Sequence, residues 1–344
     1  MSNPVPVNLT TKDFKSDQEV RWCPGCGDYA ILAAVQSFMP ELGIDRERIV
    51  FVSGIGCASR FPYYMNTYGM HSIHGRAPAI ATGLSASRPD LSVWVVTGDG
   101  DALSIGGNHL IHALRRNVNV TILLFNNRIY GLTKGQYSPT SELGKITKST
   151  PAGSADSPFN PLSLALGAEA TFVARTIDTD RKHLQSVLRA AAEHHGSAFV
   201  EIYQNCNIFN DGAFDTLKDA GSRDDYLIRL EHGEPITFGA DRQWCVVHPP
   251  GGFGLEVRRT AEVDAAEIVS HDATVPEPAY AFALSRLPDL DLRHTPIGVF
   301  RQVERPSYDS LVRQQVDTAK AAADGNPEEQ LATLLGTGDT WTIN

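Results

Sequence analysis

The chain has 344 residues, of which 42% are hydrophobic and 20% are charged, and its formal net charge is −10. The length allows one large or two medium domains, and the composition is ordinary for a globular protein with a hydrophobic core. The negative charge argues against nucleic acid as a partner, because phosphate binding needs a basic surface.

Neither a signal peptide nor a membrane-spanning helix is expected. Residues 1–20 lack an apolar stretch, and no run of about 18 apolar residues occurs in the sequence. We therefore expect a cytoplasmic protein with no membrane partner. In that reducing compartment the five cysteines are expected to be metal ligands or free thiols rather than disulfides.

Hydrophobic periodicity predicts alternating helices and strands along the first two thirds of the chain. Apolar residues recur at helical spacing from Asp28 to Phe38, and short β-branched runs end at glycine or asparagine. In chain order we expect a helix from 28 to before Pro40, a strand over 49–52, a helix over 79–87, a strand over 91–97, a helix over 108–116, a strand over 118–125, a helix over 161–166, a strand over 170–174, a helix over 180–194 and a strand over 198–203.

This alternation predicts an α/β fold with a parallel, doubly wound sheet, whose functional loops lie at the carboxyl ends of strands. Four segments fall at such ends: 54–57, 98–101, 126–127 and Cys206. From about 211 the pattern becomes irregular, with Pro, Gly and charge clusters between short apolar pieces. We therefore expect one domain over residues 1–210 and a C-terminal extension over 211–344 that contacts a partner.

The segment Gly98-Asp99-Gly100-Asp101 follows a predicted strand and leads towards a helix. Glycine lets the backbone turn sharply and approach phosphate oxygens closely, and a helix N-terminus favours an anion. Asp99 is a hard oxygen ligand suited to Mg²⁺, and Asn127 at the end of the next strand adds an amide oxygen. A Gly-Asp-Gly triplet alone is usually a turn. Strand, triplet, helix, strand and Asn-Asn together resemble the diphosphate-binding domain of thiamine diphosphate enzymes, which implies that the Asp99 and Asn127 side chains and the Ile129 carbonyl hold Mg²⁺.

Four of the cysteines lie in three places, namely Cys23 with Cys26, Cys57, and Cys206. A Cys-x-x-Cys turn alone also fits a zinc knuckle or a redox dithiol, but no second such turn and no His-x-x-x-His accompany it. Thiolates from separate loops suit a 4Fe–4S cluster, which takes one cysteine on each iron. Cys245 has no companion and is expected to be a free thiol.

Taken together, these motifs resemble the β subunit of 2-oxoacid:ferredoxin oxidoreductases, over about 20–210. The motifs are Cys-Pro-Gly-Cys-Gly at 23–27, Gly-Ile-Gly-Cys at 54–57, His-Gly-Arg at 74–76, Gly-Asp-Gly-Asp at 98–101 and Asn-Asn-x-Ile-Tyr-Gly-Leu-Thr-Lys-Gly-Gln at 126–136. The resemblance implies that the cluster is held by Cys23, Cys26, Cys57 and Cys206. It implies thiamine diphosphate contacts from Ile55, Gly56, Cys57, Ala58, His74, Gly75, Arg76, Ala77, Gly100, Asp101, Gly131 and Leu132.

The resemblance also implies a reaction: 2-oxoacid, coenzyme A and oxidised ferredoxin give acyl-CoA, CO₂ and reduced ferredoxin. Segment 131–136 is more similar to the 2-oxoglutarate branch than to the pyruvate branch. A dicarboxylate needs a cation at its far end, and Arg60 and Lys134 are the candidates. His74 is a candidate for proton transfer. A surface turn at His74 and a solvated Lys134 are the structural alternatives, and broad 2-oxoacid or pyruvate specificity remains open.

Thiamine enzymes also need a carboxylate on the pyrimidine ring of the cofactor, from a second domain of similar size. The chain after 211 has no room for that domain, so we expect it, with the catalytic Glu, on an α subunit in a heterodimer or a dimer of heterodimers. The β subunit alone should then be inactive. Three other readings make different predictions: a thiamine decarboxylase or synthase without iron, an iron–sulfur electron-transfer module without thiamine, and a structural zinc protein.

Overall fold

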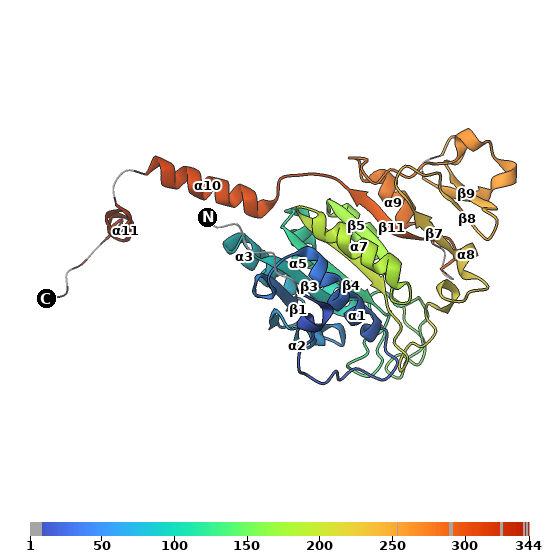
Figure 1. Cartoon of the computed structure of the whole chain (residues 1–344), viewed down its shortest axis with the longest axis horizontal. Coiled ribbons are helices and arrows are strands. Elements are labelled where there is room, and N and C mark those ends of the chain that lie inside the picture. Colours follow the sequence, from blue (N-terminus) through green and yellow to red (C-terminus); the bar gives the residue numbers. More distant parts are fainter. Residues whose placement is uncertain are drawn as a thin grey trace.

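A large sheet between two layers of helices forms the body of the protein (Figure 1). The computed structural model describes residues 9–252, 254–288, 292–323, 326–339, 341 and 343. Within these residues the sheet has eight strands in the order β2-β1-β3-β4-β6-β5-β11-β7. The strands are β1 (Ile49–Ser53), β2 (Tyr68–His71), β3 (Ser92–Gly98), β4 (Val120–Asn126), β5 (Phe172–Ile177), β6 (Ser197–Tyr203), β7 (Leu227–Leu230) and β11 (Thr295–Gln302).

Neighbouring strands are parallel except at one place, where β11 runs antiparallel to β5. A separate antiparallel sheet of three strands consists of β8 (Thr237–Phe238), β9 (Trp244–Val247) and β10 (Glu256–Arg259). The predicted α/β fold with a doubly wound, mainly parallel sheet is therefore confirmed.

The helices connect the strands and lie on both faces of the sheet. They are α1 (Asp28–Phe38), α2 (Phe61–Tyr64), α3 (Ala77–Ser87), α4 (Asp99–Leu103), α5 (Gly107–Arg115), α6 (Pro161–Gly167), α7 (Arg181–Glu193), α8 (Arg223–Tyr226), α9 (Ala279–Ser285), α10 (Tyr308–Ala322) and α11 (Pro327–Leu335). Short 3-10 helices are η1 (Thr11–Phe14), η2 (Met39–Leu42), η3 (Arg46–Arg48), η4 (Ala58–Arg60), η5 (Asp215–Leu217), η6 (Thr260–Glu262) and η7 (Ala265–Glu267).

Strand β3 explains why both faces must be covered. Its side chains alternate between two cores: Val93 and Val95 pack in the core that contains α3, α5 and α6, and Trp94 and Val96 pack in the core that contains α1 and α7. All four are buried. A strand that is apolar on both faces is stable only between two helix layers, as in parallel sheets.

Residues beyond 210 are part of this body. β7 and β11 extend the large sheet, and Ile228, Leu230 and Phe300 belong to the same core as Val93. Beyond β11, helix α10 runs out from the sheet towards the C-terminal end (Figure 1). The division at residue 210 and the partner-contacting role of the extension stay predictions.

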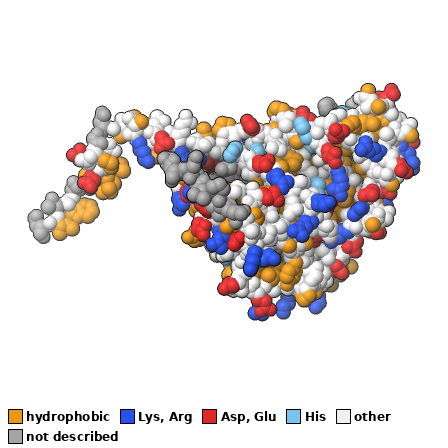
Figure 2. All heavy atoms as spheres, in the orientation of Figure 1, with side chains coloured by type: hydrophobic (Ala, Val, Ile, Leu, Met, Phe, Trp, Pro, Cys, Tyr) orange, Lys and Arg blue, Asp and Glu red, His pale blue; other side chains and the backbone are white. Residues whose placement is uncertain are grey.

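Acidic and basic side chains are interspersed on the face shown in Figure 2. Apolar side chains gather on the projecting C-terminal arm, which contains α10 and α11. On that arm Leu331, Leu334 and Leu335 of α11 are exposed. No helix among the described residues is both long and apolar enough to cross a membrane.

Candidate active site and iron–sulfur site

The carboxyl ends of β1, β3 and β4 enclose a small cavity of about 60 Å³. It is lined by Asp28, Ile55, Gly56, Cys57, Ala58, His74, Gly98, Asp99, Gly100, Asp101, Phe125, Asn127, Ile129, Tyr130, Gly131, Leu132 and Thr133. Every residue predicted to contact thiamine or magnesium is among them, except Gly75, Arg76 and Ala77. Gly75 and Ala77 adjoin the residues that line the cavity. The Gly75 N–H donates to Asp101 Oδ1 at 2.9 Å, and Ala77 begins α3.

The Gly98–Asp101 turn joins a strand to a helix at the edge of this cavity. β3 ends at Gly98 and α4 begins at Asp99, so the first N–H groups of the helix, which lack partners within it, belong to residues that line the cavity. A β-carbon on Gly100 would lie 2.2 Å from the ring of Tyr130, whose hydroxyl donates to the Gly100 carbonyl at 3.0 Å. Only glycine fits at that position.

Asp99 is almost fully buried, and its Oδ2 accepts hydrogen bonds from the hydroxyls of Ser138 at 2.5 Å and Thr140 at 2.6 Å. Burial raises the pKa of Asp99, and the two hydroxyls act in the opposite direction. A divalent cation would offset the burial of this carboxylate. With the Asn127 side chain and the Ile129 carbonyl, Asp99 offers the oxygen ligands that Mg²⁺ prefers, so the residues present fit the implied metal.

Asp28 is a site residue that the sequence analysis did not identify, because it was interpreted only as a helix start. Its side chain is buried and lines the same cavity, and among the described residues no N–H or O–H group donates to either carboxylate oxygen, although the Cys26 thiol is close enough to lower its pKa. Burial raises the pKa of Asp28 to about 7. An unpartnered buried carboxyl facing a cavity is expected where a ligand completes the site.

The four predicted cluster cysteines line one cavity of about 220 Å³. Cys206 is buried, Cys26 and Cys57 are half-buried, and Cys23 is exposed. Burial raises the pKa of the Cys26 thiol and raises that of Cys57 to about 12, and the neighbouring thiols add to both shifts. The four sulfurs therefore lie close enough to influence one another, and their thiolate forms need a cationic partner.

Hydrogen bonds hold these separate segments together. The Trp22 indole N–H donates to the Cys57 carbonyl at 2.7 Å, and the Asn207 amide donates to the Pro24 carbonyl at 2.6 Å. Gly25 has a φ of +83°, and a β-carbon there would be 2.9 Å from the Asn207 amide, so the Cys-Pro-Gly-Cys turn needs glycine.

A donor set of sulfurs alone suits zinc or an iron–sulfur cluster. Among the described residues, no group of three or more His, Cys, Asp or Glu side chains is placed to hold one metal ion. Tetrahedral zinc would need all its thiolates at about 2.3 Å from one point. A 4Fe–4S cluster instead binds each cysteine through a different iron, so its sulfurs are further apart.

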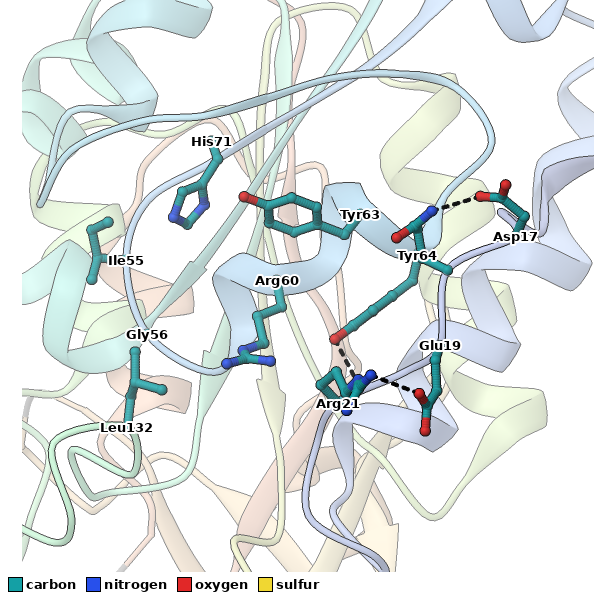
Figure 3. Close-up of a pocket in the computed structure, with 11 residues that line it drawn as sticks. Asp17, Glu19, Arg21, Ile55, Gly56, Arg60, Tyr63, Tyr64, His71 and Leu132 are labelled. Carbon is teal, nitrogen blue, oxygen red and sulfur yellow. Dashed lines mark hydrogen bonds and ion pairs between the residues drawn. The ribbon is translucent and has the colours of Figure 1, made fainter.

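A third cavity, of about 550 Å³, adjoins the thiamine loops and is shown in Figure 3. It is lined by Asp17, Gln18, Glu19, Arg21, Ile55, Gly56, Arg60, Tyr63, Tyr64, His71 and Leu132. The Arg60 side chain extends towards the side where Gly56 and Leu132 lie (Figure 3). Arg21 is paired with Glu19 at 2.8 Å, whereas the Arg60 guanidinium has no ion pair or hydrogen bond within the described part of the chain.

The other two candidates for catalysis line neighbouring cavities. Lys134 is exposed, has a φ of +75° and lines the cysteine cavity, which Arg60 also lines, but it does not line the larger cavity of Figure 3. His74 is half-exposed and lines the thiamine cavity, with its Nδ1 at 2.7 Å from Asp101 Oδ1. The geometry thus brings His74 to the cavity predicted to bind thiamine diphosphate, and it places Arg60 and Lys134 together at the cysteine cavity, with Arg60 alone of these two reaching the larger cavity.

Comparisons with known proteins agree with this geometry. Residues 54–202 match the family described as "Thiamine pyrophosphate enzyme, C-terminal TPP binding domain". The chain is 67% identical over 333 residues to "2-oxoglutarate oxidoreductase subunit KorB" of Mycobacterium tuberculosis, covering 97% of this chain and 88% of that protein.

Two further relatives differ in how much of the chain they match. "2-oxoacid:ferredoxin oxidoreductase 1, subunit beta" of Aeropyrum pernix is 48% identical over 190 residues, which is 55% of this chain and 60% of that protein. A solved structure titled "2-oxoglutarate:ferredoxin oxidoreductase from Magnetococcus marinus with 2-oxoglutarate, coenzyme A and succinyl-CoA bound" aligns with a TM-score of 0.75 and 34% identity, over 95% of this chain and 96% of that one.

Proposed function

This chain belongs to the β-subunit family of the 2-oxoacid:ferredoxin oxidoreductases, and on that premise we propose that its enzyme oxidatively decarboxylates 2-oxoglutarate. With coenzyme A, the products are succinyl-CoA and CO₂, and two electrons pass to ferredoxin. The observation that carries the proposal is a shared wall: Cys57, Asn127, Gly131 and Leu132 line both the thiamine cavity and the cysteine cavity.

The residues of this chain have distinct tasks towards the cofactors. Asp99, Asn127 and the Ile129 carbonyl would hold Mg²⁺, and the α4 N-terminus with Gly100 would receive the diphosphate. The four cysteines that line the neighbouring cavity would hold the cluster. When bound, thiamine diphosphate supplies an electron sink for decarboxylation, and the cluster accepts electrons singly.

The preference for a dicarboxylate is supported by Arg60. Its guanidinium is unpaired among the described side chains and lies in a cavity that shares Ile55, Gly56 and Leu132 with the thiamine cavity. A 2-oxoacid reacting at the thiamine site would extend its far end into that larger cavity, where a carboxylate could pair with Arg60. Arg60 is favoured over Lys134 for this role, because both line the cysteine cavity but only Arg60 also lines the larger cavity.

A partner subunit is expected to cover the mouth of the site. Edge strand β2 is exposed along its whole length, and Tyr68, Met70, Ile73 and Ile105 present apolar surface near the thiamine cavity. The described residues contain one large, mainly parallel sheet and one small antiparallel sheet, so they do not include a second domain of thiamine-enzyme size. We therefore assign the pyrimidine-binding domain and its catalytic Glu to an α subunit, in a heterodimer or a dimer of heterodimers.

Cofactor analysis of the anaerobically purified complex tests the assignment. We expect about four irons and one thiamine diphosphate per β chain, with binding of the latter dependent on Mg²⁺. Thiamine without iron would indicate a decarboxylase or synthase instead. Iron without thiamine would indicate an electron-transfer module, and zinc would indicate a structural site.

A further inference from the structure

A chain of buried hydrogen bonds begins at the carboxylate of Asp99. The Thr140 hydroxyl lies 2.6 Å from Asp99 Oδ2 and 2.9 Å from Asn126 Oδ1, so its single proton is shared between these two acceptors. Asn126 is fixed in orientation, because its Oδ1 also accepts from the Arg128 backbone N–H at 3.1 Å. Rotating the amide by 180° would place its NH₂ group against that N–H.

From Asn126 the series of hydrogen bonds continues across the sheet. The Asn126 amide N–H donates to Glu201 Oε1 at 2.7 Å, and Arg175 Nε donates to Glu201 Oε2 at 2.7 Å. Arg175 Nη1 then donates to the Pro296 carbonyl at 3.4 Å. These residues come from β4, β6, β5 and β11, which are neighbours in that order, and Asp99 follows β3 on the other side of β4. These hydrogen bonds therefore connect Asp99, the proposed magnesium ligand, with β11, a strand of the C-terminal extension.

The Arg175–Glu201 pair at the centre of this chain is not explained by stability. Both side chains are almost completely buried. The Arg175 guanidinium also packs over the rings of Tyr203 and Phe300. Removing two charges from water costs free energy that their attraction only partly returns. Apolar residues of similar volume are therefore often as stabilising or more so. A role other than stability would explain why a buried ion pair, rather than apolar side chains, occupies this position.

We propose that Thr140, Asn126 and the Arg175–Glu201 pair are positioning residues for the magnesium ligand Asp99. Ser138 and Thr140 both bind Oδ2, and Oδ1 receives no side-chain hydrogen bond among the described residues. Holding one oxygen fixes the direction in which the other faces the metal, which is how outer groups orient metal-ligating carboxylates. The inference rests on the proposed function, since it needs Mg²⁺ to bind at Asp99.

The first test replaces Thr140 in the complete complex of α and β subunits, stripped of metal. Mg²⁺ is titrated into this protein at saturating thiamine diphosphate, and cofactor binding is followed by calorimetry. Thr140→Val keeps the shape but removes the hydroxyl, and we expect its apparent affinity for Mg²⁺ to fall about 10- to 100-fold. Thr140→Ser keeps the hydroxyl and should bind within a few-fold of wild type. A Thr140→Val protein that titrates like wild type would overturn the inference.

The second test replaces the pair itself, with Arg175→Met and Glu201→Met in one protein. We expect a Tm equal to or above that of wild type, together with an affinity for Mg²⁺ lowered by about 10-fold. An exposed pair, Arg88 and Asp90 at 2.7 Å, gives the control: Arg88→Ala with Asp90→Ala should change neither quantity. A purely structural pair would lower the Tm when replaced and leave the affinity for Mg²⁺ intact, which would contradict the proposal.

Different results would contradict the proposed function and the positioning role of Thr140, Asn126 and the Arg175–Glu201 pair. If the wild-type complex binds no thiamine diphosphate with Mg²⁺, both the proposed function and this inference are wrong. If wild type binds it and the Thr140→Val and paired variants bind it equally well, only the positioning chain is wrong.

Discussion

Gly131 lies directly against Cys57: a β-carbon on Gly131 would be 3.4 Å from the Cys57 Sγ. The same β-carbon would be 3.7 Å from the Sγ of Cys206. Gly131, in the loop after β4, and Cys57 line both the thiamine cavity and the cysteine cavity, whereas Cys206 lines the cysteine cavity. Cofactors bound in these cavities would be separated by little more than this loop. Short separation is what an enzyme needs if electrons leave a thiamine-bound substrate through a cluster.

Replacing a cysteine that lines the cysteine cavity should lower the iron content of the complex, whereas replacing Cys245 should not. Cys23→Ser and Cys206→Ser each remove one thiolate from the cluster cavity, so we expect iron to fall from about four atoms per chain to near zero. The measurement is iron content and visible absorbance of the anaerobic complex. Cys245→Ser is the matched control, because Cys245 is buried in β9 away from this cavity. Iron that persists in Cys206→Ser, or is lost in Cys245→Ser, would contradict the ligand assignment.

Arg60→Met should weaken binding of dicarboxylates selectively. Loss of a hydrogen bond to a charged group costs about 1.5–3 kcal/mol, so KM for 2-oxoglutarate should rise about 10- to 100-fold while KM for pyruvate changes little. Arg21→Met is the matched control, because Arg21 lines the same cavity but is already paired with Glu19. Lys134→Met should also have little effect. A larger change in Lys134→Met than in Arg60→Met would move the carboxylate site to Lys134.

His74→Gln should lower kcat with little change in KM. Asp101 Oδ1 lies 2.7 Å from Nδ1 of the His74 ring, and this ring lines the cavity, so Nε2 is the nitrogen we assign to proton transfer. General acid–base groups contribute about 10²- to 10⁴-fold to rate, and we expect a fall of about 100-fold. Asp101→Asn keeps an oxygen to accept from His74, so its effect should be smaller. An unchanged kcat in His74→Gln would make the His-Gly-Arg segment a structural turn.

His194 should lower stability as the pH drops from about 6.5 to about 4, whereas Asp28, whose pKa is raised to about 7 by burial, contributes in the opposite direction. Burial lowers the pKa of His194 from 6.5 to about 4, so between these values the unfolded chain binds a proton that the folded chain does not. His194 therefore makes the free energy of unfolding decrease by about 1.4 kcal/mol per pH unit in this window. His183, which is half-buried and whose pKa burial lowers to about 4, adds to the slope.

The measurement is the urea midpoint of wild type and His194→Gln between pH 7 and pH 4.5. The variant should be less stable at pH 7 and should lose less stability on acidification, so the two midpoints converge. His248→Gln, at an exposed position, should follow the wild-type slope. Parallel curves for wild type and His194→Gln would contradict the assignment.

Central strands of the fold could be predicted because they are apolar on both faces. The strand predicted over 91–97 is β3 (Ser92–Gly98), and the strand predicted over 118–125 is β4 (Val120–Asn126). The prediction of 170–174 was displaced, since the strand is Phe172–Ile177. β2 was missed because all four of its residues are exposed and show no alternation. β11 was missed because it contains Pro296 and Gly298, which are rare inside strands.

Within the site, residues that act through local motifs were predictable, and those that act through distant contacts were not. Asp99, Asn127 and the cysteines occur in short patterns whose chemistry is specific. Ser138 and Thr140 reach Asp99 from about forty positions away along a segment without helix or strand, and no local pattern marks them. Glu201 and Arg175 lie in apolar strands, where a sequence gives no reason to expect a buried ion pair.

The most direct test of the central claim is ferredoxin reduction by the anaerobic, iron-replete complex of this chain with its α subunit. Rates are compared for 2-oxoglutarate and pyruvate, each with and without coenzyme A. The account predicts rapid reduction with 2-oxoglutarate that requires coenzyme A, and much slower reduction with pyruvate. Equal rates with the two acids would contradict the role given to Arg60. No reduction with either acid, from a complex that contains both iron and thiamine diphosphate, would contradict the proposed function.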